Sequence, residues 1–144
     1  MDESVTDLIE QLEEERAHLR LVLEQVPSDT VAVRPSSAWS VLENVRHLLF
    51  AEQLHLQQPF TRAVEWSPLG YDPETMQETR KLPPVTATPS LEVVLAAWDA
   101  VHAETLTRLE SAEEAAARAA LDRNLKHLRA HSKVIERLAR NASN

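Results

Sequence analysis

A single glycine, Gly70, is present among the 144 residues of this chain, and this scarcity constrains the fold more than any other feature. Turns of types I′, II and II′ depend on glycine where φ is positive, so a fold built from β-hairpins is disfavoured. The abundant residues are instead alanine, leucine, glutamate and arginine, which favour helix. We therefore predict an all-α fold.

Length and composition are typical of one globular domain. Hydrophobic residues make up 43% of the chain and charged residues 26%, which suffices for one core. Neither half of the sequence is long enough to bury a core alone. We predict a single domain over residues 1–144.

Charge and cysteine content exclude several classes of function. The net charge is −8 and the acidic residues are spread along the chain, whereas nucleic-acid binding needs basic patches. The absence of cysteine excludes disulfides, thiolate metal ligands and a cysteine nucleophile. We expect no nucleic-acid partner.

The N-terminal stretch MDESVTDLIEQ is acidic and lacks the basic-then-apolar layout of a signal peptide. No apolar run approaches the roughly 18 residues that a membrane span needs. We expect no membrane association and a cytoplasmic location.

Apolar residues that recur at steps of three and four predict four helices. The first runs from about Ser4 to Val26, and the second from Ser40 to about Arg62, with Pro59 kinking it or ending it early. The third runs from Thr88-Pro89-Ser90 to about Ser111. The stretch SAEEAAARAA that follows is compatible with helix or with a turn. The apolar residues of the last helix are Leu121, Leu125, Leu128, Ile135 and Leu138.

The start of the second helix carries a specific local signal. Ser40 is followed three residues later by Glu43, the spacing of a capping box. In this motif the serine oxygen accepts a hydrogen bond from the backbone N–H of the glutamate, and the glutamate carboxylate accepts one from the backbone N–H of the serine. We therefore interpret Glu43 as a helix cap.

A long connection separates the second and third helices. Residues 64–89 hold five of the eight prolines and the only glycine, with room for one short helix after Asp72-Pro73. A connection of this length in a compact domain is usually functional or covers something. Four amphipathic helices with one long connection predict a four-helix bundle.

Three histidines are candidate metal ligands. His127 and His131 are four residues apart, so both lie on one helical face and can bind one ion. Such a pair also arises by chance on exposed surfaces, and His47 alone fits a hydrogen-bonded core residue. Together the three would form a three-nitrogen site, because bundle metal sites combine ligands from facing helices.

The pattern W-S-x-x-E-x-x-x-H-L-x-x-x-E from Trp39 to Glu52, and the later HLRAHSKVI, resemble the signatures of the DinB/YfiT superfamily. The resemblance implies a four-helix bundle in which His47, His127 and His131 bind a divalent metal ion, with zinc or nickel favoured. It also implies a homodimer, and characterised relatives include transferases and isomerases that use a low-molecular-weight thiol.

Three hypotheses of function follow. The first is a metal-dependent enzyme that activates a thiol or water for a transferase or hydrolase reaction on a small molecule. The second is a non-catalytic dimeric module with a vestigial or structural metal site, and the third is a stress-linked binding domain without metal. If the metal is bound, ordinary imidazole pKa values predict that binding weakens below about pH 6.

The other candidate residues have simpler interpretations. Glu52 lies well round the helix from His47, so we expect it to brace a neighbouring helix rather than to bind metal. His55 is a weaker candidate for the same cavity, and His18 and His102 fit partly exposed positions. The candidates for a substrate wall or pocket mouth are Trp39, Trp66, Tyr71 and Met76.

Overall fold

The computed structural model describes residues 2–36, 38–78 and 88–142, and these residues form helices and loops without any strand. The elements are α1 (Glu3–Glu24), α2 (Val41–Leu56), the 3₁₀-helix η1 (Gln58–Phe60), α3 (Pro73–Glu78), α4 (Leu91–Glu110) and α5 (Glu114–Ala142). The prediction of an all-α fold is confirmed, with a fifth, short helix beside the four long ones. Over the described ranges, no helix has an apolar stretch long enough to traverse a bilayer.

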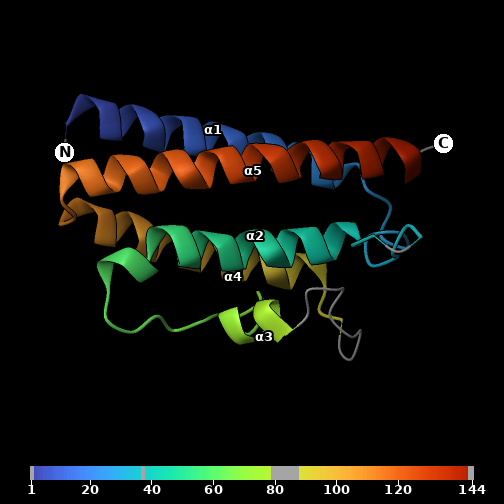
Figure 1. The fold of residues 1–144 in the computed structure, drawn as a ribbon. Helices are drawn as coiled ribbons and strands as arrows, with labels where there is room; N and C mark the ends of the chain where they lie inside the picture. The colour runs from blue at the N-terminus through green and yellow to red at the C-terminus, as the bar shows by residue number, and fades with distance from the viewer. Residues whose placement is uncertain (1, 37, 79–87, 143–144) are drawn as a thin grey trace.

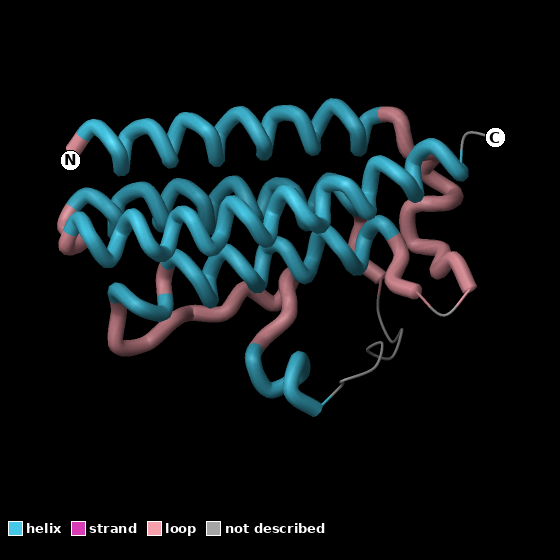
Figure 2. Tube along the Cα trace, turned by 45° about the horizontal axis from the view of Figure 1, so that its top comes forward, coloured by secondary structure: helices cyan, strands magenta, loops and turns pink. Residues whose placement is uncertain are grey.

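The four long helices lie side by side (Figures 1 and 2). α5 packs against α1 and α2, and α2 also packs against α4. The colours of Figure 1 show that α1 and α5 run in one direction, and α2 and α4 in the other. Because α2 and α4 are parallel, the chain must return along the whole length of the helices between them. Residues 57–78, which include η1 and α3, and residues 88–90 make the described part of that return; residues 79–87 of the predicted loop lie outside the described residues.

α2 begins where the sequence predicts. Ser40 Oγ accepts from the backbone N–H of Glu43 at 3.1 Å, and Glu43 Oε1 accepts from the backbone N–H of Ser40 at 3.0 Å, so the capping box is complete. Of the two predicted outcomes, the helix ends early and does not reach Arg62: the α-helix stops at Leu56, and η1 follows. Pro59 lies in η1, where its missing N–H and its ring prevent further α-helix.

The stretch after α4 resolves into a short turn followed by α5. Glu113 lies just before α5, and its carboxylate accepts from the backbone N–H groups of Ala115 and Ala116 at 3.0 and 2.9 Å. This side-chain cap satisfies two amides that a helix start leaves free. The last helix therefore starts earlier than its apolar residues alone indicate.

Gly70 is buried, and its φ is not positive. A Cβ at this position would lie 2.5 Å from Leu49 Cδ2 and 3.3 Å from the carbonyl oxygen of Arg46, both on α2. Glycine is therefore needed for close approach and not for a special turn. It lets the segment that leads to α3 pack directly on α2.

Candidate metal centre

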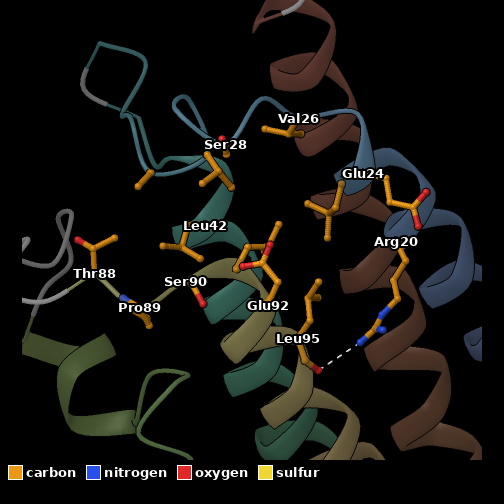
Figure 3. Close-up of a pocket in the computed structure, with 14 residues that line it drawn as sticks. Arg20, Glu24, Val26, Ser28, Leu42, Thr88, Pro89, Ser90, Glu92 and Leu95 are labelled. Carbon is orange, nitrogen blue, oxygen red and sulfur yellow. Dashed lines mark hydrogen bonds between the residues drawn. The ribbon is translucent and has the colours of Figure 1, made fainter.

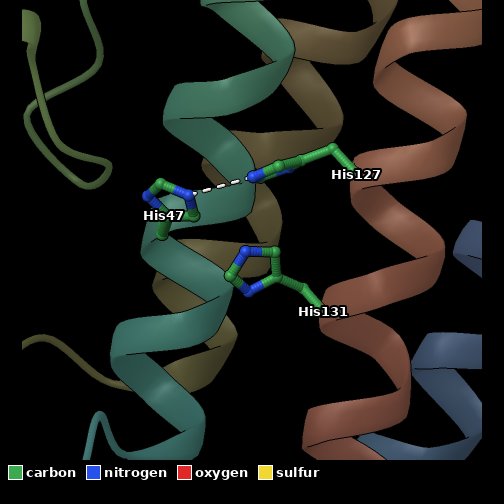
Figure 4. Close-up of side chains that lie close together, drawn as sticks. All are labelled: His47, His127 and His131. Carbon is green, nitrogen blue, oxygen red and sulfur yellow. Dashed lines mark hydrogen bonds between the residues drawn. The ribbon is translucent and has the colours of Figure 1, made fainter.

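His47 on α2 meets His127 and His131 on α5 (Figure 4). One ligand nitrogen from each ring lies within 4.8 Å of the others, and all three side chains are half-buried. The Nε2 atoms of His47 and His127 are 3.2 Å apart. The structure thus brings together the three histidines that the sequence singles out; that they hold a metal remains a prediction.

Helix geometry explains the convergence. His127 and His131 are one turn apart on α5, so their rings project from the same side of that helix (Figure 4). Their ring centroids are 4.5 Å apart, and the His47 centroid lies 5.0 and 4.8 Å from them. Since α2 and α5 pack against each other, the His47 ring on α2 lies opposite the rings of His127 and His131 on α5.

The outer ring nitrogens have different partners. Nδ1 of His131 lies 3.0 Å from Oδ1 of Asn44, and Nδ1 of His47 lies 3.3 Å from Sδ of Met76. In both rings Nδ1 is occupied, which leaves Nε2 as the atom available to a metal. Nδ1 of His127 is buried and has no hydrogen-bond partner among the described residues.

The electrostatic environment keeps these rings neutral. Burial lowers the pKa of His47 to about 3, with further contributions from the positive charge that His131 and His127 carry when protonated. Burial and the charge of His127 lower the pKa of His131 to about 4, and burial also lowers the pKa of His127. Neutral imidazole is the form that binds metal ions.

The donor set fits a divalent ion. Zinc binds imidazole nitrogen at about 2.0–2.1 Å, so two nitrogens on one tetrahedral ion lie about 3.4 Å apart. The separation of 3.2 Å between the Nε2 atoms of His47 and His127 is close to that value. Three neutral nitrogens without a carboxylate are a donor set that suits zinc and nickel better than calcium or magnesium.

A comparison with protein families agrees with this geometry. The sequence model of the DinB superfamily matches residues 4–140. The chain belongs to the DinB superfamily. No curated protein and no solved structure matched it. The predicted resemblance is therefore confirmed at the level of the superfamily.

Aromatic side chains surround His47 in this DinB protein. The ring of Trp39 lies 4.9 Å from that of His47, and the ring of Phe50 lies at 5.8 Å. Tyr71 contacts Trp39 at 6.2 Å, and Trp66 contacts Phe50 at 5.7 Å. Of the predicted wall residues, Trp39 and Met76 contact His47, and the other two contact its aromatic neighbours.

Glu52 braces α4, as expected. Its buried carboxylate accepts from Trp98 Nε1 at 3.2 Å, from Thr105 Oγ1 at 3.0 Å and from His102 Nδ1 at 3.1 Å, all on α4. The prediction that His102 is partly exposed is wrong, because this ring is 5% exposed and lies between Glu52 and Glu13. Burial lowers the pKa of His102, but the bond and charge of Glu52 outweigh burial and raise it above the ordinary value.

The remaining histidines are separate from the group of three. His18 is exposed on α1 and contacts Glu136, as predicted for a surface residue. His55 is buried, its ring lies 5.3 Å from that of His127, and its Nδ1 accepts from Asn124 Nδ2 at 3.1 Å. The ring of His55 therefore lies next to the candidate metal centre, but His55 is not one of its three histidines.

The contacts of Asn44 and Met76 with the histidines were not predicted from the sequence. Asn44 had a detectable signal, because it lies three residues before His47 and so on a neighbouring face of the same helix. Met76 had none that identifies its contact, since it reaches His47 from the long connection, 29 residues away.

A separate pocket of about 550 Å³ lies where the end of α1 meets the starts of α2 and α4 (Figure 3). Its walls include Leu42 and Leu95, and Arg20 at its edge donates to the carbonyl oxygen of Leu95 at 3.2 Å. None of the three histidines lines it. This pocket is therefore not the opening of the candidate metal centre.

Proposed function

We propose that this DinB superfamily member binds one divalent metal ion through His47, His127 and His131 and uses it to transform a small molecule. The observation that carries the proposal is the convergence of three neutral imidazoles from two helices within 4.8 Å. Of the divalent ions that accept imidazole nitrogen, we propose zinc or nickel. The reaction class is transferase or hydrolase.

Three neutral protein ligands leave at least one coordination position open, which is the arrangement of catalytic zinc sites. When bound, such an ion lowers the pKa of water or of a thiol and polarises a carbonyl group. The chain has no cysteine, so a thiol nucleophile must come from a low-molecular-weight cosubstrate.

The protein's own residues have distinct tasks in this proposal. The histidines present neutral nitrogen, because burial opposes their protonation. Trp39 and Met76 pack beside His47 and keep bulk water from that side of the ring. Tyr71 packs beside Trp39, and Arg46 lies 4.7 Å above the Tyr71 ring, which holds this wall in place.

The same proposal extends to the whole chain. Residues 1–144 form one domain, a four-helix bundle whose long connection between α2 and α4 carries Tyr71 and Met76 to the centre. A homodimer and a link to stress response are further expectations from the family resemblance, and a cytoplasmic location is the expectation from the N-terminal sequence and the lack of a long apolar run.

Titration of the metal-free protein with zinc and nickel by calorimetry tests the proposal. The parent should bind one ion. Because the ligands act together, His47→Ala, His127→Ala and His131→Ala should each lose most of the affinity. His18→Ala is the matched control, since His18 is exposed on α1 and away from the centre.

Two results would contradict the proposal. If His47→Ala binds as tightly as the parent, the site is only a pair on α5 and the enzyme hypothesis loses its main support. If the parent binds no metal even in excess, the chain is better explained as a non-catalytic binding module.

A further inference from the structure

We infer that Asn44 is a positioning residue of the metal centre, which holds His131 in the tautomer that presents Nε2 as the metal ligand. This inference rests on the proposed function, since it assigns a role toward the metal that the three histidines would bind. It concerns a residue that contacts a ligand and not the ion itself.

The orientation of the Asn44 amide is determined by two hydrogen bonds. Nδ2 donates to the carbonyl oxygen of Ser40 at 2.9 Å, and Oδ1 lies 3.0 Å from Nδ1 of His131. A carbonyl oxygen only accepts, so the amide nitrogen must face Ser40 and the amide oxygen must face His131. The side chain is 3% exposed, so water does not compete for either bond.

This orientation selects one form of His131. The amide oxygen of Asn44 has no hydrogen to give, so Nδ1 of His131 must carry the hydrogen in the bond between them. A neutral imidazole has one N–H, and its lone pair is then on Nε2. Nε2 is therefore already the nitrogen of His131 that is available to a metal ion in the metal-free protein.

The anchor of Asn44 is rigid. Ser40 is the N-cap of α2, and its side chain and backbone N–H are both held by Glu43. Glu43 is in turn paired with Arg34 at 2.6 Å. The bond to His131 therefore starts from a turn of α2 that the capping box and the Arg34–Glu43 pair hold in place, which limits the freedom of the ring on α5.

The other two histidines have weaker support. The partner of His47 is the sulfur of Met76, which is a weak acceptor, and Nδ1 of His127 has no partner within the described ranges. Among these described contacts, the Asn44 oxygen is thus a stronger acceptor than the sulfur of Met76. Removal of such a partner of a metal-binding histidine typically lowers metal affinity 10–100-fold.

The test combines the hydrogen position with zinc binding. Asn44→Leu removes the acceptor at similar volume, and Asn44→Ala removes it without adding bulk. Asn44→Asp keeps an acceptor oxygen for His131 but loses the side-chain N–H given to the Ser40 carbonyl, which still accepts the backbone N–H of residue 44 at 3.0 Å, so this variant tests the acceptor apart from the side-chain anchor. Asn124→Leu is the matched control, because Asn124 is also buried but is bonded to His55, which is not among the three.

Nitrogen-15 NMR of the side chain in metal-free protein reports which nitrogen of His131 carries the hydrogen, and calorimetry reports zinc affinity. In the parent and in Asn44→Asp we expect the hydrogen on Nδ1 and zinc affinities within a few-fold of each other. In Asn44→Leu and Asn44→Ala we expect a shift toward the Nε2–H form and zinc binding about 10–100-fold weaker. Asn124→Leu should change neither readout.

Distinct results overturn the inference and the proposed function. A hydrogen on Nε2 in the parent, unchanged zinc affinity in both Asn44→Leu and Asn44→Ala, or an equal loss in Asn124→Leu would show that Asn44 has only a structural role. Failure of the parent to bind either zinc or nickel, with the hydrogen of His131 on Nδ1, would instead overturn the proposed function and with it any role of Asn44 toward a metal.

Discussion

The Nε2 atoms of His47 and His127 lie 3.2 Å apart, although the two residues are separated by 80 positions in the chain. Without a metal, one ring must donate a hydrogen to the other, since two lone pairs at this distance repel each other. Nδ1 of His47 faces Met76, so His127 is the better donor. A cation bound to both Nε2 atoms would take the place of that hydrogen. The single N–H of the His127 ring would then be at Nδ1. The distance between the two Nε2 atoms therefore suits either a hydrogen bond between the rings or binding of both rings to one metal ion.

Metal release should occur at lower pH than free histidine suggests. Burial, followed by the charges of its histidine neighbours, lowers the pKa of His47 to about 3, and burial with His127 lowers that of His131 to about 4. Protons then compete with the metal only well below the ordinary value of 6.5. We expect zinc release with a midpoint below about pH 5 instead of about pH 6. Equilibrium dialysis with metal analysis across this range measures it.

The same pKa values determine the sign of the effect on stability. Between the lowered folded values and 6.5, the unfolded chain binds protons that the folded protein refuses. The contribution of these histidines to the stability of the metal-free protein should therefore be greatest above about pH 6.5 and be lost as pH falls.

A midpoint of zinc release near pH 6 would mean that the histidine rings are more hydrated than their burial indicates.

The cap of α2 should contribute measurably to stability. Ser40→Ala removes the acceptor of the Glu43 backbone N–H and should cost about 1 kcal/mol of unfolding free energy. Zinc affinity should fall only slightly, because the Ser40 carbonyl that holds Asn44 remains. Urea denaturation measures the first effect and calorimetry the second.

Ser90→Ala is the comparison for this cap. Ser90 caps α4 through the Val93 backbone N–H at 3.3 Å, but this cap is exposed and water can replace it. Its loss should cost less than the loss of Ser40. Stability unchanged within error in Ser40→Ala would contradict the capping-box interpretation.

Local signals in the sequence predicted part of this structure, and distant contacts explain the rest. The start of α2 was predictable because Ser40 and Glu43 are three residues apart and their bonds are local. His102 was misjudged because its partners, Glu52 and Glu13, are 50 and 89 residues away and no local pattern encodes them. The candidate metal centre lies between these cases: His127 and His131 are a local pair, whereas His47 could be joined to them only by assuming that bundle helices face each other.

The network around Glu52 should be a major source of stability. Glu52→Leu leaves Trp98 Nε1, His102 and Thr105 Oγ1 without their acceptor in a buried place, which should cost about 3–5 kcal/mol. Glu52→Gln retains one acceptor oxygen and should cost less. Chemical denaturation of both variants measures the difference.

The control for this network is Glu104→Gln. Glu104 is an exposed residue of α4 that pairs with Arg108 at 2.7 Å, so its loss should change stability by less than about 1 kcal/mol. If Glu52→Leu is as mild as Glu104→Gln, the carboxylate is not the brace between α2 and α4 that its contacts indicate.

The only glycine should be intolerant of even one added methyl group. In Gly70→Ala the new Cβ would meet Leu49 Cδ2 at 2.5 Å and the Arg46 carbonyl oxygen at 3.3 Å, so either the segment or α2 must shift. Overpacking of a buried position typically costs about 1–3 kcal/mol. Because Gly70 directly precedes Tyr71 and lies on the path to Met76, zinc affinity should fall as well. Thermal unfolding and calorimetry measure the two effects.

A second substitution separates contact with Leu49 from the approach to the Arg46 carbonyl. Leu49→Val removes Cδ2, the atom nearest to the new methyl group, but keeps carbons at the γ position, so Gly70→Ala should cost less in that background than in the parent. The rescue should be partial, since the Arg46 carbonyl belongs to the α2 backbone and cannot move away. A double-mutant cycle with no coupling between the two positions would show that the cost arises from the approach to the Arg46 carbonyl and not from contact with Leu49.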